Sequence, residues 1–290
     1  MEILTEEKIR ELIREELKKH FSEGIDIPSR RTVSVNNSHQ NFVDTNDYYS
    51  PYLFTDNKRG YETISIFQRK STIDKIDSNP LLNALKQRKG WKFNNAKEDL
   101  HKLLRNFVSA AKLLPKYDTI IMTPSNNQLN KIVFGYLIRL IRHNYHIEDF
   151  FQKMTASDVY NCMIDDDYID SNFGDIADRV RDDIDDAFSE MQQHNNGIFS
   201  YKYLQRAAYR EIIMQSMKIK QYPHCELNYA NEINGKDVLV FDDTITTGKT
   251  ISDSGNAIKE MFNPKSITYI TLFSAIDKDN NSSIKKVNSI

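Results

Sequence analysis

The sequence predicts an α/β fold built on a parallel sheet, and three observations support this prediction. Residues 238–241 (VLVF) form an uninterrupted apolar run, as expected for a strand covered on both faces. A helical pattern follows over 251–262, and then a second β-rich run over 266–276. An earlier run at 118–123 (DTIIMT) is likewise followed by a helical pattern over 130–142. Strands that alternate with helices in this way are typical of parallel sheets.

Composition excludes several classes of protein. The chain has 290 residues, of which 39% are hydrophobic, enough for a sizeable core. A net charge of −2 predicts no general affinity for nucleic acid or anionic membranes. No apolar run approaches the ~20 residues of a membrane helix, and the charged start of the chain differs from a signal peptide. The two cysteines, Cys162 and Cys225, have neither metal-ligand nor disulfide spacing. We therefore expect a soluble protein of the reducing cytoplasm that binds neither nucleic acid nor membranes.

An amphipathic helix is expected at the N-terminus, within residues 1–21. Thr5 can cap this helix, and its apolar residues recur at helical spacing: Ile9, Leu12, Ile13, Leu17 and Phe21. A stripe of this kind is most often a packing or oligomerisation face. We expect it to pack within the protein, against a second copy or against a protein partner.

Residues 22–116 are expected to form a linker followed by a helical region. Residues 22–59 are rich in Ser, Asn and Asp without sustained periodicity, which indicates a linker or surface loop. Helical signals return over 78–90 and 96–113. Between them lies Trp91, flanked by lysines. Such a cluster can stack on nucleic-acid bases, but an aromatic anchor for a helix end is the simpler interpretation.

An acidic segment spans residues 155–200. Its helical apolar stripe comprises Ile176, Val180, Ile184, Phe188 and Met191. We expect a helical insertion in a core that spans 117–277. Its acidic side is either a solvated face or a docking surface for a basic partner. The polar tail at 278–290 is expected to fray.

The stretch VLVFDDTITTGKT at 238–250 ends like a nucleotide-binding P-loop. Such a loop needs a glycine five residues before Gly248, where this chain has Asp243, whose charge would repel nucleotide phosphates. Backbone N–H groups at a helix start can instead hold one phosphate. The adjacent carboxylates of Asp242 and Asp243 can accept hydrogen bonds from vicinal hydroxyls, directly or through Mg²⁺. A ribose 5-phosphate carries both groups.

These residues resemble the signature of the type I phosphoribosyltransferases, in which four apolar residues and two acidic residues precede a Thr/Gly-rich loop. That loop binds 5-phosphoribosyl-1-pyrophosphate (PRPP). Residues 238–241, Asp242 with Asp243, and 246–250 match the signature position by position. The resemblance implies a phosphoribosyltransferase-like parallel-sheet core with a helical N-terminal extension and a helical insertion. It implies Mg²⁺ at Asp242 and Asp243, and PRPP contacts at Asp242, Asp243, Thr244, Ile245, Thr246, Thr247, Gly248, Lys249 and Thr250.

The pyrophosphate loop of this family follows the first core strand. Here it corresponds to Thr123, Pro124, Ser125 and Asn126, with no cation before Lys131. Replacement cations are expected from Lys153 or from residues 198–213, whose pattern resembles a helix with one shared face for Lys202, Arg206 and Arg210. The alternative is that this face pairs with the acidic insertion. For Lys249 both possibilities stay open: its side chain contacts PRPP or points to solvent.

The resemblance also implies a function: transfer of phosphoribose from Mg²⁺–PRPP to a nitrogenous acceptor, with release of pyrophosphate. Charge neutralisation and positioning account for most of such catalysis, so no single catalytic base is nominated. Thr246 stands where purine-salvage members have an aspartate, which disfavours hypoxanthine and guanine as acceptors. The alternative is a weakly active or inactive PRPP-binding sensor or effector module with a protein partner.

Overall fold

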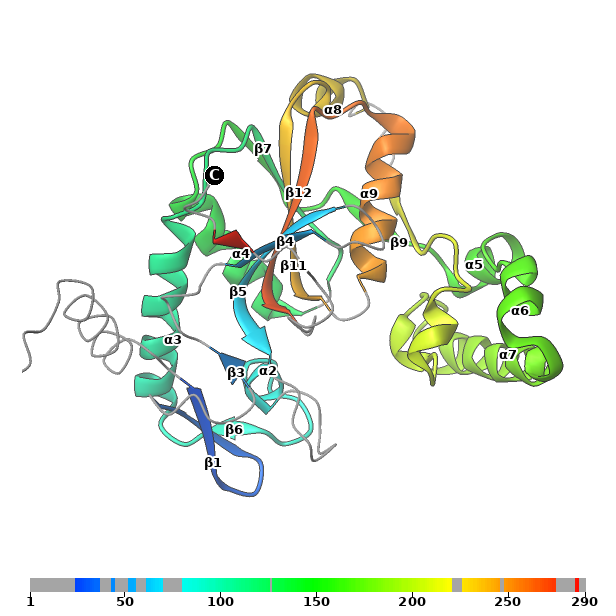
Figure 1. Cartoon of the computed structure of the whole chain (residues 1–290), viewed down its shortest axis with the longest axis horizontal. Coiled ribbons are helices and arrows are strands. Elements are labelled where there is room, and N and C mark those ends of the chain that lie inside the picture. The colour runs from blue at the N-terminus through cyan, green and yellow to red at the C-terminus, as the bar shows by residue number, and fades with distance from the viewer. Residues whose placement is uncertain are drawn as a thin grey trace, which may run out of the picture.

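A computed structural model describes most of the chain. The described residues are 24–36, 43–44, 52–55, 61–69, 80–125, 127–220, 226–245, 248–274 and 285–286 (Figure 1). The helix expected at 5–21 lies outside these residues, as does the tail at 278–290 apart from Lys285 and Lys286. No helix in the described part of the chain is long and apolar enough to cross a membrane.

The protein is an α/β protein with a central sheet, as predicted. Five strands of this sheet are parallel, in the order β5–β12–β11–β7–β8. They are β5 (Glu62–Arg69), β12 (Ser266–Ser274), β11 (Asp237–Ile245), β7 (Thr119–Met122) and β8 (Tyr145–Ile147). Strands β11 and β12 run side by side through the centre of the sheet (Figure 1). The apolar runs in the sequence therefore identify the strands in the middle of the sheet.

Helices cover both faces of the sheet, which explains why β11 is apolar without alternation. Successive strand residues point to opposite faces. Leu239 and Phe241 pack with helices α3 (Ala96–Ala111) and α4 (Gln128–Leu140). Val238 and Val240 pack on the other face with α8 (Glu226–Ile233) and α9 (Lys249–Met261).

The linker expected at 22–59 is wrong for the described residues, which form strands. They are β1 (Gly24–Ser29), β2 (Thr32–Asn36), β3 (Val43–Asp44) and β4 (Tyr52–Thr55). Strands β1 and β2 form a small sheet with β6 (Lys92–Phe93), whereas β3 and β4 pair with β5. β13 (Lys285–Lys286) extends the central sheet beyond β4. These strands are short and separated by polar residues, so periodicity did not reveal them.

The N-terminal region also contains helical elements, and its apolar residues join the main core. Helix α2 (Pro80–Leu85) and α3 confirm the helical signals at 78–90 and 96–113. Val33 and Val35 of β2 pack with Leu81 and Trp91 in the core cluster beside the sheet. The Trp91 side chain is only 8% exposed, so it does not offer a face to nucleic-acid bases.

The acidic segment belongs to a helical body that extends from the central sheet (Figure 1). Its ends are joined by an antiparallel pair, β9 (Phe151–Lys153) and β10 (Met217–Ile219). Between them lie α5 (Ala156–Cys162), α6 (Asp166–Phe173), α7 (Ala177–His194) and the 3₁₀ turns η1 (Gly174–Ile176), η2 (Tyr201–Tyr203) and η3 (Ala207–Arg210). Four members of the predicted apolar stripe, Val180, Ile184, Phe188 and Met191, are buried on α7, whereas Ile176 belongs to η1 and is exposed. This body reaches Ser216, beyond the expected boundary at residue 200.

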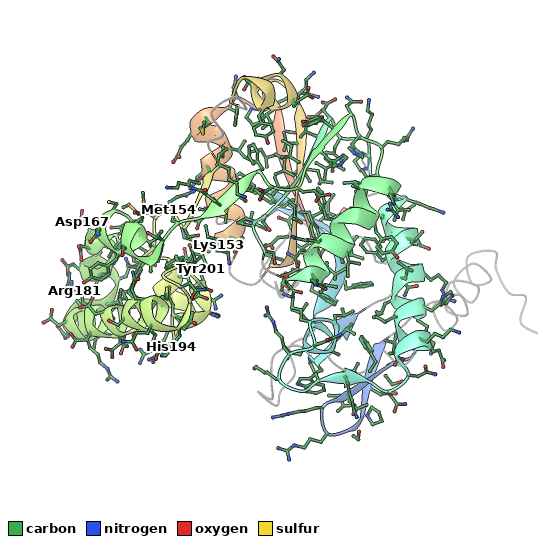
Figure 2. All side chains as sticks on the ribbon, turned by 180° about the vertical axis from the view of Figure 1, so that it is seen from behind. Lys153, Met154, Asp167, Arg181, His194 and Tyr201 are labelled. Carbon is green, nitrogen blue, oxygen red and sulfur yellow. The ribbon has the colours of Figure 1, made fainter. Side chains whose placement is uncertain are left out.

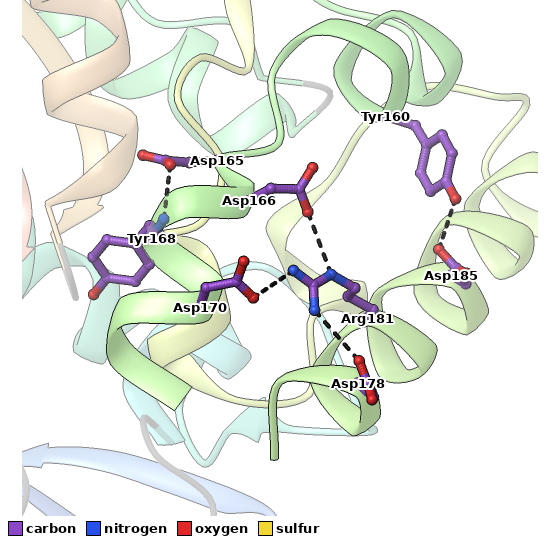
Figure 3. Close-up of polar contacts among 8 residues, drawn as sticks. All are labelled: Tyr160, Asp165, Asp166, Tyr168, Asp170, Asp178, Arg181 and Asp185. Atoms are coloured by element: carbon purple, nitrogen blue, oxygen red, sulfur yellow. Dashed lines mark hydrogen bonds and ion pairs between the residues drawn. The ribbon is translucent and has the colours of Figure 1, made fainter. Parts of the chain in front are cut away.

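On the acidic surface of the insertion, one arginine pairs with three aspartates (Figure 3). Arg181 contacts Asp170 at 2.6 Å, Asp166 at 3.4 Å and Asp178 at 3.5 Å. The Tyr160 hydroxyl donates a 2.8 Å hydrogen bond to Asp185. Because these side chains pair within the insertion, the contacts favour a solvated face over a docking surface for a basic partner.

The continuous helix expected over 198–213 is wrong. This stretch consists of the turns η2 and η3 with extended residues between them. Its buried residues Phe199, Leu204 and Tyr209 are spaced by five, so they cannot share one face of an α-helix. Lys202, Arg206 and Arg210 consequently do not form a common cationic face.

Candidate functional site

The site lies where the connections of the sheet change direction. From β7 the chain passes through α4 outward to β8, whereas from β11 it passes through α9 to β12 on the opposite side. Crevices at such switch points, outside the carboxyl ends of the strands, are the usual binding sites of parallel sheets. Here the crevice brings Thr123, just after β7, to Asp242 near the end of β11. The Thr123 N–H donates to the Phe241 carbonyl at 2.9 Å.

Asp242 lies at the bottom of this crevice and is buried. Its Oδ1 accepts hydrogen bonds from the Thr123 hydroxyl at 3.0 Å and from the Asp243 backbone N–H at 2.9 Å. Burial, and then the neighbouring charge of Asp243, raise the pKa of Asp242 to about 7. The pair can therefore hold or release a proton near neutral pH.

Asp243 is paired with a lysine that sequence reasoning missed. Lys86, just after α2, forms an ion pair with Asp243 Oδ2, and the two side chains are only 7% and 14% exposed. Lys86 begins a cation-rich turn, KQRK at 86–89. That cluster was the available signal, but nothing local indicates that it lies against β11.

A cavity of about 560 Å³ adjoins the acidic pair and is lined by cations. Among its lining residues, all in the described part of the chain, four are cationic and none is acidic: Lys86, Arg88, Lys153 and Lys202. Ser125, from the predicted pyrophosphate loop, and Asn127, just after that loop, also line it, whereas Asn126 lies outside the described residues. Lys153 lies where the insertion joins the core (Figure 2). Burial lowers the pKa of Lys153, whereas the negative charge of Asp242 acts in the opposite direction and raises it. This cavity suits a polyanion.

Two smaller cavities lie next to the cationic cavity, and neighbouring cavities share lining residues. One of about 210 Å³ is lined by Asp242, Asp243, Thr244 and Thr250, and it shares Ser125, Lys153 and Ser200 with the cationic cavity. The next, of about 50 Å³, is lined by Gly248, Thr250 and Arg210, and it shares Asp242, Thr244 and Tyr201 with the second. Cations, carboxylates and the Thr/Gly-rich turn therefore border a series of neighbouring cavities.

The turn itself is described in part, because Thr246 and Thr247 lie outside the described residues. Gly248 has φ +73° and begins α9, a left-handed conformation that glycine adopts without strain. In the described structure the buried Thr244 hydroxyl oxygen has no hydrogen-bond partner. Thr244 as a residue lines both small cavities, and an unpaired polar atom next to them is consistent with a ligand position.

The Lys249 side chain turns inward, so it does not point to solvent. Its Nζ lies 2.9 Å from Asp253 Oδ1 and donates to the Met214 carbonyl at 3.1 Å. The Tyr201 hydroxyl donates to the same aspartate at 2.6 Å, and the Ser216 hydroxyl also contacts it. Lys249 and Asp253 together therefore connect α9 to both ends of the segment that returns from the insertion.

The three tentative cations are dispersed. Lys202 lines the cationic cavity, and Arg210 lines the small cavity beside Gly248. Arg206 instead lies over the Tyr209 ring, with 5.6 Å between the guanidinium carbon and the ring centroid. Arg206 lines none of the three cavities.

The acidic pair fits Mg²⁺ only in combination with a ligand. No group of three or more His, Cys, Asp or Glu side chains that could enclose a metal ion occurs in the described residues. Mg²⁺ commonly uses one or two carboxylates, keeps several waters and takes other oxygens from a bound phosphate. Asp242 and Asp243, beside the orphaned Thr244 hydroxyl, provide a donor set of that kind.

Comparisons with protein-family models, with curated proteins and with solved structures found no match to this chain.

Proposed function

We propose that this protein binds PRPP and transfers its phosphoribose to a nitrogenous acceptor, with release of pyrophosphate. The observation that supports this most directly is the order of groups along the neighbouring cavities. Four cations come first, then two carboxylates, then a glycine turn at a helix start. PRPP carries its pyrophosphate, vicinal hydroxyls and 5-phosphate in the same order. The family resemblance of residues 238–250 fits this order.

The carboxylates are suited to hold the ribose. Asp242 is fixed by two hydrogen bonds to one of its oxygens, so its orientation is set before a ligand arrives. Asp243 is held by Lys86. A bound diol therefore either shares the Asp243 carboxylate with Lys86 or displaces Lys86 from that carboxylate. In both arrangements the contacts of Lys86 change when the ligand binds.

The phosphate of the ligand is assigned to the turn before α9. The first backbone N–H groups of a helix have no partner within the helix, and the helix dipole favours an anion there. Gly248, the Thr244 hydroxyl and the Thr250 side chain border the cavity at this point, with Arg210 opposite. Thr246 and Thr247 complete the turn in sequence.

The cationic cavity is assigned to the pyrophosphate. In the proposed reaction the bond between ribose C1 and the pyrophosphate oxygen breaks, and its electron pair leaves with the pyrophosphate. The acceptor nitrogen then forms a bond to C1 and loses its proton to solvent. Lys86, Arg88, Lys153 and Lys202 stabilise the charge that develops on the leaving group. Mg²⁺, when bound, would neutralise further charge on the same oxygens.

The end of the insertion forms a wall of the site. Phe199, Ser200 and Tyr201 line the cavity that contains the carboxylates, and Tyr201 is anchored on Asp253. This wall excludes water from one side of the reacting ribose. For the fold, we propose a type I phosphoribosyltransferase-like core, to which β5 adds a fifth parallel strand.

A pyrophosphate-release assay tests the proposal. The full chain would be incubated with PRPP, Mg²⁺ and a panel of nitrogenous bases, beside Asp243→Asn and the control Arg206→Ala. Release with at least one base, lost in Asp243→Asn and retained in Arg206→Ala, is the expected result. PRPP binding without release for any base would reject the transferase in favour of a sensor or effector module. Absence of PRPP binding would reject both.

A further inference from the structure

An apolar groove lies between α3 and α4, and it shares Leu85, Leu129 and Ile132 with the cationic cavity. It has a volume of about 230 Å³, and every residue that lines it is apolar or aromatic. Leu103 and Phe107 of α3 and Val133 of α4 form part of its floor. The two helices run beside each other on this side of the sheet (Figure 1).

The rim of this groove exposes an unusual amount of apolar surface. Leu100 is 43% exposed, Leu104 38%, Ile132 56% and Tyr136 39%. They come from two different helices yet border one cavity. A contiguous apolar patch of this kind, unlike scattered single residues, marks a contact surface.

The start of the described chain lies near the first two turns of α3. Gly24 pairs with Asn36 at the end of β2. The preceding residue of β2, Val35, donates its N–H to Asp99 at 2.7 Å and accepts a 3.1 Å hydrogen bond from Lys102. Asp99 and Lys102 lie on the side of α3 next to the face that lines the groove, so Gly24 is one helix face away from Leu100.

The residues before Gly24 match the groove in chemistry and are long enough to cover it. The apolar stripe Ile9, Leu12, Ile13, Leu17 and Phe21 ends three residues before Gly24. A helix over residues 5–21 would be about 25 Å long, whereas the α3 residues that line the groove, 100–107, span about 12 Å. The short link after Phe21 gives this segment a high effective concentration at the groove compared with a separate molecule.

We infer that residues 5–21 of the same chain pack as an amphipathic helix in the groove between α3 and α4. The apolar stripe would cover Leu100, Leu104, Ile132 and Tyr136, while its charged residues face solvent. The N-terminal helix is then an integral part of the helical layer that α3 and α4 form on this face of the sheet. This inference is independent of the PRPP assignment.

Disulfide trapping in the full chain tests this inference. In a Cys162→Ser, Cys225→Ser background, Leu104→Cys would be combined in turn with Ile9→Cys, Ile13→Cys or Leu17→Cys. Matched controls combine Leu104→Cys with Glu11→Cys or Lys18→Cys, which lie on the opposite side of the expected helix. We expect at least one apolar-face pair to form an intrachain disulfide about tenfold faster than both controls.

Two outcomes would overturn the inference. A disulfide that forms between chains would show that a second copy occupies the groove. Equal rates for apolar-face and polar-face pairs would show that residues 5–21 do not dock there. Hydrogen exchange gives a readout without engineered cysteines: Ile13→Glu should speed amide exchange in α3 and α4, whereas Lys18→Glu should not. Unchanged exchange in Ile13→Glu would also contradict the inference.

Discussion

Lys86 forms an ion pair with Asp243, which joins the turn after α2 to the carboxyl end of β11. The two side chains are almost fully removed from solvent, so each stabilises the charge of the other. The contact also brings Lys86 next to Asp242, where its charge lowers the pKa that burial raises. The N-terminal region therefore forms part of the site.

Removing Lys86 should destabilise the protein. In Lys86→Gln, Asp243 stays partly buried beside Asp242 without its cation, and breaking a buried pair in this way costs on the order of 3 kcal/mol. Chemical denaturation would measure the free energy of unfolding, with Lys97→Gln as an exposed control on α3. The double variant Lys86→Gln, Asp243→Asn should lose less free energy of unfolding than the two single variants lose together. Additive losses would show that the ion pair is not an energetic unit.

The pKa of Asp242 predicts a pH dependence of stability. Because burial raises this pKa from 3.8 to about 7, the folded state binds a proton that the unfolded state releases at lower pH. The contribution of Asp242 to stability is therefore greatest at acidic pH and falls as the pH rises toward 7. Relative to Asp242→Asn, the wild type should lose several degrees in Tm between pH 5 and pH 8, at about 2–4 °C per kcal/mol. A constant difference between the two melting curves would contradict the burial of this carboxyl group.

The cationic cavity predicts which substitutions weaken pyrophosphate binding. Arg88→Ala and Lys202→Ala should each reduce affinity for inorganic pyrophosphate about tenfold, equal to about 1.4 kcal/mol. Added salt should diminish these effects, because both side chains are solvent-exposed. Arg206→Ala is the matched control, because Arg206 stacks on Tyr209 within the insertion. Equal weakening by all three variants would point to general charge attraction rather than to this cavity.

Two glycines in helices should respond in opposite directions to alanine. A Cβ at Gly255 in α9 would lie 2.6 Å from the hydroxyl oxygens of Tyr61 and Tyr269, whose rings pack edge to face. Overpacking of this kind costs about 1–3 kcal/mol, more than the roughly 1 kcal/mol that alanine gains in a helix.

Gly135 in α4 provides the control, because a Cβ there meets no atom within 4 Å. Gly135→Ala should therefore raise the free energy of unfolding by up to about 1 kcal/mol. A gain of stability in Gly255→Ala would show that α9 packs less closely against Tyr61 than the structure indicates.

The sequence was sufficient to identify β7, β11 and β12, each of which contains a run of consecutive apolar residues, but not β5. In β5, Thr63 and Ser65 alternate with apolar residues yet are 0% and 1% exposed, so polar residues there do not mark a solvent face. The parallel partner of β5 is β12, at the other end of the chain. No local pattern indicates such a pairing, and the residues of β5 were assigned to a linker and helical region.

The same distinction applies to the site. Asp242, Asp243 and the turn that follows are consecutive in sequence, so a motif was sufficient to find them. Lys86 and Arg88 reach the cavity through the packing of α2, which depends on the whole fold. For Lys249 the motif left the direction of the side chain open, because it did not show that the buried Asp253 one helical turn later attracts that side chain.

Calorimetric titration of the full chain with PRPP, in the presence and absence of Mg²⁺, tests the central claim most directly. We predict saturable binding by the wild type and by Arg206→Ala, with affinity at least about tenfold lower in Asp243→Asn. No binding by the wild type, or equal affinity in Asp243→Asn, would contradict the assignment of the carboxylate pair to the ribose.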